Sequence, residues 1–197
     1  MRIIGVTGGV GAGKSTVLKV LKEEYGAELL MADEIGRELM EPGAACFRPV
    51  IEVFGETVIG EDGRLNRGKI AEAVFKAPEA LKKLNGIIHP AVRREIERRL
   101  SLLRMTEPEK TAVIESAILI EAGYEEICPE IWYVRADKET RIGRLMESRG
   151  YSREKCLEVM ANQMADEELL ARATAVINNG GSRTSTKEQI ASLMALG

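Results

Sequence analysis

The segment GGVGAGKS at positions 8–15 constrains this chain more than any other feature. It fits the pattern G-x-x-x-x-G-K-[ST], in which glycines let the backbone turn so that its N–H groups point at phosphate oxygens. The apolar run IIGVT precedes it at 3–7, and a helical pattern over about 15–25 follows it. A strand, this loop and a helix in that order indicate a site for a nucleoside triphosphate rather than an ordinary glycine-rich turn.

The residue types of this loop predict separate contacts to the triphosphate. Lys14 is expected to bridge the β- and γ-phosphates, the Ser15 hydroxyl to bind Mg²⁺, and Thr16 to contact the α-phosphate. The N-terminus of the following helix adds positive potential at the same place. Backbone contacts to ATP are expected from four further loop residues: Gly9, Gly11, Ala12 and Gly13.

Short apolar runs alternate with helical segments along the whole chain. Such alternation favours an α/β fold in three layers, with a parallel sheet covered by helices on both faces. We expect a five-stranded parallel sheet with strands at 3–7, 28–31, 111–114, 131–134 and 175–177.

The spacing of these runs predicts a single domain, 1–197, with two helical insertions. About 75 residues between the second and third strands read almost entirely as helix, which is too long for a simple crossover. We interpret this block as a helical substrate-binding insertion, and a later charged helical pair, about 138–148 and 152–163, as a lid. The expected boundaries are a core at about 1–40, 104–137 and 166–197, the insertion at about 41–103, and the lid at about 138–165.

Local signals predict where several helices begin. Pro90 suits a first helical position, so a helix over 91–103 is expected to open there. His89 then caps or packs at that helix start, with a substrate contact as the alternative reading. Near the C-terminus, the sequence from Ser185 to Glu188 fits a capping box and predicts that the last helix begins there.

Composition excludes several classes of protein. The 197 residues carry 28 Lys+Arg against 31 Asp+Glu, so the slightly acidic balance argues against indiscriminate nucleic-acid binding. No stretch reaches the roughly 20 apolar residues of a membrane span, and we expect no signal peptide. The three cysteines, Cys46, Cys128 and Cys156, are too far apart for a zinc site or a disulfide framework. We therefore expect a cytoplasmic protein, and the single histidine favours a carboxylate as catalytic base.

Three classes of nucleotide-dependent protein remain to be weighed. A GTPase switch is suggested by D-x-x-G at 33–36, but the guanine-reading N-K-x-D motif is absent from the chain. An NTPase motor or transporter would need an Asp at the end of an apolar strand, and Glu115 after Val113 and Ile114 is only a weak version of that signal. A small-molecule kinase needs a carboxylate near the acceptor hydroxyl and cations around the transferred phosphoryl group.

The chain offers both kinds of residue that a kinase needs. Asp33 follows the second strand at its C-terminal end, where ligands bind in such sheets. It is also placed to be the N-cap of a helix over 35–40, and both roles can hold at once. Arg141, Arg144 and Arg149 lie in the predicted lid, and the first two share a helical face, which favours phosphate clamping over a solvated surface role. A nucleoside monophosphate kinase of the same architecture stays an open alternative.

Further segments stand in a characteristic order along the chain. They are IGVTGGVGAGKS at 4–15, ADEIGREL at 32–39, LNR at 65–67, IHP at 88–90, LIEAG at 119–123, Arg144 with Arg149 and Gln163, and ATAVINNGGS at 173–182. This ordered set resembles the dephospho-coenzyme A kinase family nearly from end to end. Phosphate loops are common among proteins, whereas the order of the other segments is far more specific.

The resemblance implies the P-loop nucleoside-triphosphate-hydrolase-like fold and transfer of the ATP γ-phosphate to the ribose 3′-hydroxyl of dephospho-coenzyme A, the last step of coenzyme A synthesis. It implies Mg²⁺ as cofactor, ATP and dephospho-coenzyme A as the small-molecule partners, no nucleic-acid or membrane partner, and a monomer or weak homo-oligomer. The implied catalytic residues are Asp33, Lys14 and Arg144, and the implied substrate contacts are Asp33, Arg67 and His89. The implied Mg²⁺ ligands are Ser15 and Asp33. Further ATP contacts are implied for Arg141, Arg144 and Asn179.

Five positions depart from the family's usual pattern. Met31 replaces the first acid of D-A-D, Asn66 the Asp of L-D-R, Ala117 a common Pro, Ala12 a frequent Ser and Thr174 a frequent Asp. None of them removes the phosphate loop or the acid at position 33. The change at position 31 removes the acid that usually stands two residues before it.

Overall fold

The computed structural model describes residues 1–196, apart from the side chains of residues 76 and 78. The chain divides into two compact units. The first, here called the sheet unit, contains Met1–Leu30 and the chain from Leu103 onward. The second, here called the helical unit, is Met31–Leu102.

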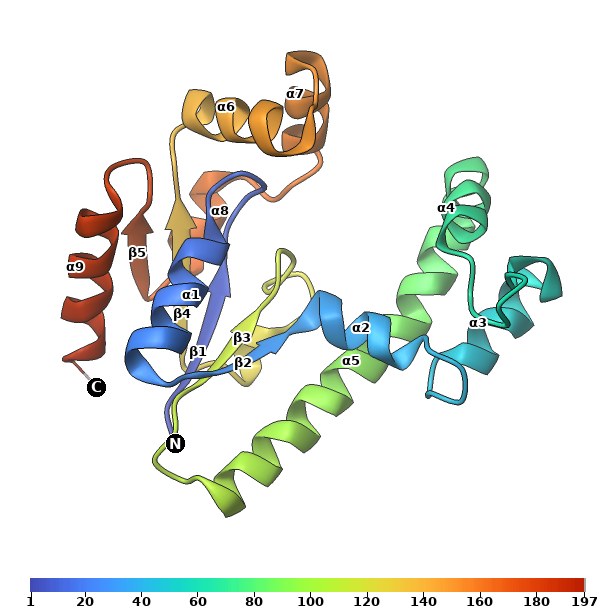
Figure 1. Ribbon diagram of the computed structural model, residues 1–197, viewed down its shortest axis with the longest axis horizontal. Helices are drawn as coiled ribbons and strands as arrows, with labels where there is room; N and C mark the ends of the chain where they lie inside the picture. Colours follow the sequence, from blue (N-terminus) through green and yellow to red (C-terminus); the bar gives the residue numbers. More distant parts are fainter. Residues whose placement is uncertain (197) are drawn as a thin grey trace. The chain divides into compact units, whose positions relative to one another are not determined.

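The strands form one sheet in the order β2-β3-β1-β4-β5 (Figure 1). Strand β1 pairs in parallel with both β3 and β4, and β4 pairs in parallel with β5. The bounds are β1 (Ile3–Thr7), β2 (Glu28–Met31), β3 (Ala112–Glu115), β4 (Glu130–Arg135) and β5 (Ala175–Asn178). The predicted α/β fold with a five-stranded parallel sheet is confirmed, with strand ends within one residue of the expected ones.

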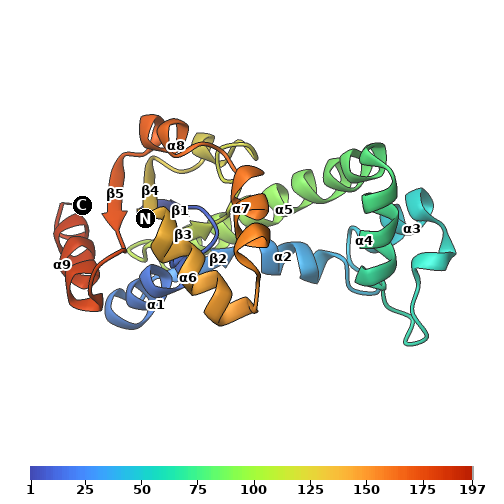
Figure 2. The same cartoon turned by 90° about the horizontal axis from the view of Figure 1, so that it is seen from above.

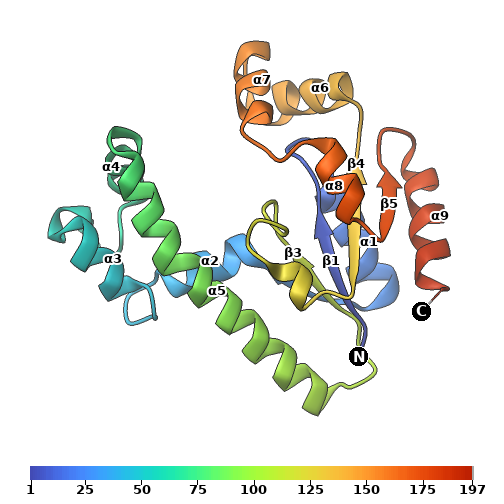
Figure 3. The same cartoon turned by 180° about the vertical axis from the view of Figure 1, so that it is seen from behind.

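Helices cover both faces of this sheet. Figures 2 and 3 show α1 (Lys14–Tyr25) and α9 (Arg183–Met194) on one face and α8 (Asp166–Arg172) on the other. Every residue of β1 and β3 is buried, which explains why both strands read as continuous apolar runs rather than alternating ones. This burial makes the carboxyl end of β1 a rigid base for the loop that follows.

Helix α9 begins three residues earlier than the sequence suggested. Its N-cap is Ser182, whose hydroxyl accepts a hydrogen bond from the Ser185 backbone N–H at 3.2 Å. The predicted start at Ser185 is therefore wrong. Two serines three residues apart offered two caps, and Ser182 directly follows Gly180 and Gly181, so the chain turns into the helix at the first of them.

The predicted lid region, still within the sheet unit, consists of two capped helices. Asp137 caps α6 (Lys138–Arg149), and Ser152 caps α7 (Arg153–Ala161). Their shared core contains Ile142, Leu145 and Cys156. Val10 of the phosphate loop packs against the same cluster, so apolar packing links these helices to the loop.

The helical unit has its own small core. Val50, Val58 and Ile70 are buried there, and Leu84 and Ile87 are among the partly buried residues packed against them. Its elements are α2 (Ala32–Leu39), α3 (Phe47–Phe54), the 3-10 turn η1 (Glu56–Val58), α4 (Arg67–Lys76) and most of α5 (Pro78–Thr106). The chain turns sharply around Gly63, where the Gly60 N–H donates to the Arg64 carbonyl at 2.7 Å and Gly63 has φ +75°.

Pro90 lies inside α5 and does not open a new helix. The prediction of a separate helix over 91–103, with His89 at its start, is therefore wrong. An interior proline costs about 3 kcal/mol in an isolated helix, but Val92, Ile96 and Leu100 beyond it are all buried and stabilise the continuous helix. Although α5 spans 29 residues, neither it nor any other helix within residues 1–196 is apolar enough over a sufficient length to cross a membrane.

Candidate active site

The phosphate loop connects β1 to α1 at the carboxyl end of the sheet. In the strand order, β3 lies on one side of β1 and β4 on the other, so the chain changes direction across the sheet at this point. Ligands of open parallel sheets bind at such a position. The fold therefore places the GGVGAGKS segment at the position in the sheet where ligands bind.

Two glycines of the loop are required by their surroundings. Gly13 has φ +86°, and a Cβ at that position would overlap the side-chain amide nitrogen of Asn179. A Cβ on Gly9 would overlap the guanidinium of Arg141. These side chains approach the loop backbone so closely that only glycine fits at both positions.

Basic side chains bind the carbonyl groups along the loop. Lys14 Nζ donates to the Gly8 carbonyl at 2.9 Å, and Arg141 Nε donates to the Val10 carbonyl at 2.9 Å. Arg144 donates to the Ala12 carbonyl at 3.2 Å. Free carbonyl oxygens in the loop would repel phosphate oxygens. Hydrogen bonds from the basic side chains to these carbonyls reduce that repulsion.

Asn179, directly after β5, holds the same loop from another side. Its amide nitrogen donates to the carbonyls of Ala12 at 2.8 Å and Gly13 at 3.3 Å. Its own backbone carbonyl accepts a 2.7 Å hydrogen bond from Arg144. Asn179 is 4% exposed, so these contacts are shielded from water and correspondingly strong.

The N-terminus of α1 supplies donors for a phosphate group. The first N–H groups of a helix have no carbonyl partner within the helix, which applies here to Lys14 and Ser15. By contrast, the N–H groups of Ala12 and Thr16 already donate to the carbonyls of Gly9 and Gly13 at 3.1 and 3.0 Å. The donors best placed for phosphate oxygens are therefore those at the start of the helix.

Glu115 lies beside the loop lysine. It is the last residue of β3, is 8% exposed, and its carboxylate lies 3.5 Å from Lys14 Nζ. From the sequence alone this acid was only a weak version of the Asp expected at the end of an apolar strand. In the folded chain it is the acid nearest to the lysine that the motif assigns to the phosphates.

Arg141 is buried in a polar network. It is 7% exposed, donates to the Gln163 side-chain oxygen at 3.1 Å and lies 3.7 Å from Asp166. The same Gln163 oxygen accepts the Val10 backbone N–H at 2.9 Å. Burial raises the pKa of Tyr133, and its hydrogen bond to the Asp166 carboxylate raises that pKa further, so the phenol stays protonated at neutral pH.

Asp33 belongs to the helical unit, in the first turn of α2. The N-cap of this helix is Met31, so the interpretation of Asp33 as N-cap is wrong. Its carboxylate is exposed and has no hydrogen bond or ion pair with any residue that the structure describes. The helix dipole stabilises a negative charge at this end, and the carboxylate is available to a ligand.

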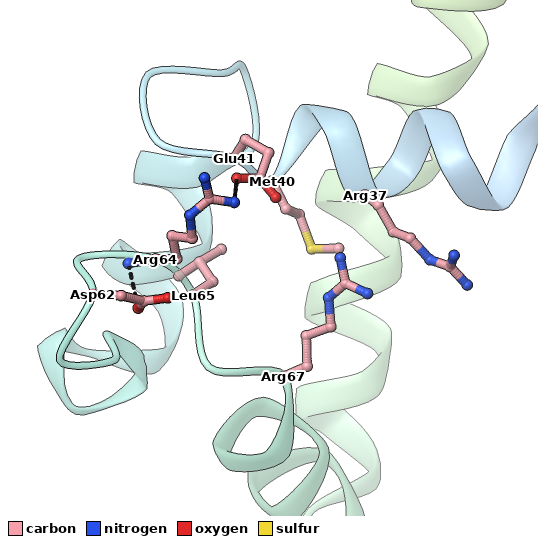
Figure 4. A pocket seen from close by; sticks show the side chains of 7 residues that line it. All are labelled: Arg37, Met40, Glu41, Asp62, Arg64, Leu65 and Arg67. Atoms are coloured by element: carbon pink, nitrogen blue, oxygen red, sulfur yellow. Dashed lines mark hydrogen bonds and ion pairs between the residues drawn. The ribbon is translucent and has the colours of Figure 1, made fainter.

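A cavity of about 240 Å³ within the helical unit gathers three arginines (Figure 4). Arg64 donates to Glu41 at 2.6 Å. Arg37 and Arg67 point toward the same open space, and neither side chain has an ion-pair partner in the described part of the chain. The cavity is lined by Arg37, Met40, Glu41, Asp62, Arg64, Leu65 and Arg67.

The remaining predicted site residues lie as follows. His89 is half-buried within α5 of the helical unit. Ser15 is exposed at the second position of α1, and Arg149 ends α6, where it stacks over Tyr151 at 5.8 Å. The sheet unit thus brings Lys14, Arg141, Arg144 and Asn179 together around the loop, whereas Asp33, Arg67 and His89 belong to the helical unit.

Comparisons with known proteins agree on one family. The family model described as dephospho-CoA kinase matches residues 2–185. A dephospho-CoA kinase of Carboxydothermus hydrogenoformans is 38% identical over 98% of this chain and 92% of its own length. One from Geobacter sulfurreducens is 38% identical over 99% and 98%. Among solved structures, TT1252 from Thermus thermophilus is 35% identical, with a TM-score of 0.84 over 99% of this chain and 96% of its own.

The chain belongs to the dephospho-CoA kinase family. It is therefore a kinase of coenzyme A biosynthesis, a phosphotransferase with an alcohol group as acceptor. This result decides against the GTPase switch and the nucleoside monophosphate kinase as alternatives. A shikimate kinase from Acinetobacter baumannii, 19% identical with a TM-score of 0.50 over 100% of this chain and 94% of its own, shares the fold alone.

Two departures from the usual pattern of dephospho-CoA kinases have a structural explanation. Asn66 caps α4 by accepting the Lys69 N–H at 3.1 Å, a task for which Asn and Asp are equally suited. The Thr174 hydroxyl accepts the Ile131 N–H at 2.9 Å beside the β4–β5 pair. Nothing in the structure explains Ala117.

Sequence reasoning missed two contacts of this dephospho-CoA kinase site. Gln163 was placed in the lid without a partner, and Thr186 was given no role. Thr186 is fully buried and donates to the Asn179 side-chain oxygen at 2.9 Å. Asn179 lies seven residues before Thr186, across the turn that joins β5 to α9, and a threonine in such a helix carries no sequence signal for a side-chain contact across that turn.

Proposed function

We propose that this kinase transfers the γ-phosphate of ATP to the ribose 3′-hydroxyl of dephospho-CoA, with Asp33 as the general base. The products are coenzyme A and ADP. The observation that carries the proposal is the phosphate loop, whose carbonyls are bound by Lys14, Arg141, Arg144 and Asn179 while donors at the start of α1 have no partner within the helix.

The donor half of the reaction is assigned to the sheet unit. The backbone at Gly9, Gly11, Ala12 and Gly13 surrounds the phosphates, with Ser15 and Thr16 at the helix start. Lys14 exchanges its contact with the Gly8 carbonyl for the β- and γ-phosphates, and Arg144 stabilises charge on the transferred group. Arg141 and Asn179 contribute to ATP binding through the loop that they hold.

The protein residues present suit Mg²⁺ that arrives with ATP. Mg²⁺ keeps several waters and takes one or two protein oxygens plus phosphate oxygens. Residues 1–196 contain no cluster of three or more acidic, histidine or cysteine ligands, and the Ser15 hydroxyl is exposed at the loop. We assign Ser15 and Asp33 as its protein ligands. The bound ion would neutralise charge on the β- and γ-phosphate oxygens.

The acceptor half is assigned to the helical unit. Asp33 orients the attacking hydroxyl and takes its proton, which an exposed carboxylate without an ion-pair partner can do. Arg67 binds the acceptor phosphates, and the cavity places Arg37 beside it as a second cation. His89 is assigned to acceptor contact.

An acceptor panel tests this function. ADP release with ATP and Mg²⁺ is measured for dephospho-CoA, adenosine, AMP and shikimate, and ³¹P NMR of the product identifies the phosphorylated hydroxyl. We expect a strong preference for dephospho-CoA and a single 3′-phosphate. Equal rates across the panel, or phosphate on another hydroxyl, would contradict the proposal.

The proposed setting is cytoplasmic, with no nucleic-acid or membrane partner. A net charge of −3 gives no general attraction to nucleic acid. We assign a monomer or weak homo-oligomer. Light scattering after gel filtration at several protein concentrations tests this, and a stable large assembly at low concentration would contradict it.

A further inference from the structure

The hydroxyl of Thr186 lies at the end of a short chain of buried contacts that reaches the phosphate loop. Thr186 is on α9, is fully buried, and donates to the Asn179 side-chain oxygen at 2.9 Å. The amide nitrogen of Asn179 donates in turn to the carbonyls of Ala12 and Gly13. The Asn179 amide thus connects α9 to two loop residues that lie 167 and 166 positions away in sequence.

We propose that Thr186 is a positioning residue for the nucleotide phosphates, acting on the loop through Asn179. This inference rests on the proposed role of residues 8–15 as the phosphate site of ATP. Thr186 touches no reacting atom. It fixes which way the Asn179 amide faces, and the amide fixes the loop backbone.

The orientation of the Asn179 amide follows from its neighbours. Two loop carbonyls on one side require the NH₂ group there, because an oxygen in that place would face two acceptors. The amide oxygen on the other side then needs a donor, and the Thr186 hydroxyl provides it. Without that hydroxyl, a buried acceptor is left unsatisfied, which costs more than the loss of an exposed hydrogen bond.

Holding these carbonyls also orients N–H groups toward the phosphate site. In a trans peptide the carbonyl oxygen and the following N–H point in opposite directions. Turning the Ala12 and Gly13 carbonyls to Asn179 therefore turns the N–H groups of Gly13 and Lys14 the other way. Preorganised donors of this kind bind a charged group without reorganisation at the moment of reaction.

The same contacts define the role of Asn179. Its side-chain nitrogen and oxygen are both occupied, by the loop carbonyls and by Thr186. The side chain is therefore assigned to the loop and not to the nucleotide base. Loss of the Thr186 contact should weaken phosphate binding and leave base preference unchanged.

The test compares Thr186→Val, which removes the hydroxyl at nearly constant volume, with Thr186→Ser, which keeps it. For Thr186→Val we expect kcat/KM for ATP to fall about 5- to 10-fold, as for one lost buried hydrogen bond. Inorganic triphosphate has no base and competes with ATP for the same site. Its affinity, measured as an inhibition constant, should fall by the same factor. The ATP/GTP preference and KM for dephospho-CoA should change less than twofold, and Thr186→Ser should restore binding.

A matched control separates positioning from general stability. Gln189 lies three residues further along α9, and its side chain bonds the backbone of Asn178 at 2.8 and 3.0 Å without touching the loop. Gln189→Met should leave ATP and triphosphate binding unchanged even if the melting temperature falls. If Thr186→Val does not fold, Thr186→Ala serves in its place.

Three results would overturn the proposal. The first is wild-type triphosphate affinity in folded Thr186→Val, and the second is an equal loss in Gln189→Met. The third is an altered ATP/GTP preference with unchanged triphosphate affinity, which would assign Asn179 to the base. Triphosphate binding by calorimetry needs no acceptor, so the outcome does not depend on which alcohol the kinase phosphorylates.

Discussion

The two units of this kinase use their cations in opposite ways. In the sheet unit, Lys14, Arg141 and Arg144 all donate to carbonyls of the phosphate loop, and Lys14 also lies beside Glu115. In the helical unit, Arg37 and Arg67 are exposed beside a cavity and have no ion-pair partner among the residues described. One set of cations is engaged with the protein itself, and the other is available to a ligand.

This difference separates two ways of binding an anion. A loop whose carbonyls are already bound presents its N–H groups in place, so little conformational freedom is lost when phosphate arrives. Exposed arginines instead lose side-chain freedom when they bind, which lowers the gain from each contact. We infer that the nucleotide site is built in advance and that the acceptor site is ordered by its substrate.

The largest effect is expected at Lys14. Lys14→Ala removes the cation assigned to the transferred phosphoryl group and should lower kcat about 10³-fold, the upper end for a lost electrostatic stabiliser. The measurement is steady-state ADP formation with saturating dephospho-CoA. Lys19→Ala on the exposed side of α1 is the control and should retain normal turnover, because Lys19 forms an ion pair with Glu23 at 3.8 Å. Normal turnover in Lys14→Ala would remove the loop assignment.

The next largest effect is expected at Asp33. Asp33→Asn keeps the size of the side chain but cannot accept the acceptor's proton, so turnover should fall about 10²-fold or more with ATP affinity nearly unchanged. Glu34→Gln removes the same charge from the same helical turn and should leave turnover intact. Stopped-flow or quenched single turnovers measure the transfer step. Equal behaviour of the two variants would contradict the base assignment.

A smaller effect is expected at Gln163. Gln163→Leu removes an acceptor shared by the Val10 N–H and Arg141, and should lower kcat/KM for ATP about 5- to 10-fold while KM for dephospho-CoA stays constant. The side chain of the neighbouring Asn162, the C-cap residue of α7, donates to the Glu158 carbonyl of that helix, so Asn162→Ala is the control. An equal change in both KM values would argue against a role confined to the loop.

The smallest effect concerns stability in the helical unit. Hydrogen bonds from Arg98 and Arg99 lower the pKa of Glu95 from 4.5 to about 2. The pKa of Glu95 is lower in the folded state than in the unfolded state. The interaction of its carboxylate with the two arginines therefore stabilises the protein fully above about pH 4.5, and this stabilisation is lost as the pH falls toward 2.

Glu95→Gln should therefore lower the free energy of unfolding by about 0.5–1 kcal/mol at pH 7, since Arg98 is largely exposed. The difference from the native protein should shrink between pH 4.5 and 3. Urea unfolding at pH 7, 4.5 and 3 measures it. A difference that grows toward low pH would contradict the assignment.

The parts of the fold that sequence predicted well are those with local signals. The strands at 3–7 and 28–31 and the loop at 8–15 follow from short apolar runs and glycine spacing, and the structure has them at those positions. The predicted start of α9 was wrong because two serines offered competing N-caps. The predicted helix start at Pro90 was wrong because packing of the continuous helix outweighed the local preference of proline.

The contacts of the site could not be predicted to the same depth. Sequence identified Arg141 and Arg144 as a pair on one helical face, which the structure bears out, but the pattern favoured phosphates as their partners. Their carbonyl partners at Val10 and Ala12 are more than 130 residues away, and no local pattern encodes that approach. Thr186 bonds Asn179, seven residues earlier, but the two residues lie on either side of the turn between β5 and α9, and no local sequence pattern marks that contact.

The contrast between the two units is tested most directly by equilibrium binding of ATP and of dephospho-CoA, each measured alone by calorimetry on Arg144→Lys and Arg67→Lys. Lysine keeps the charge but not the forked geometry of the guanidinium. We predict that Arg144→Lys lowers the affinity for ATP about tenfold and leaves the affinity for dephospho-CoA unchanged. Arg67→Lys should lower the affinity for dephospho-CoA by a similar factor and leave that for ATP unchanged. The assignment of donor and acceptor to separate units would be contradicted if each variant lost affinity for both ligands equally. It would also be contradicted if Arg144→Lys lowered only the affinity for dephospho-CoA and Arg67→Lys only the affinity for ATP.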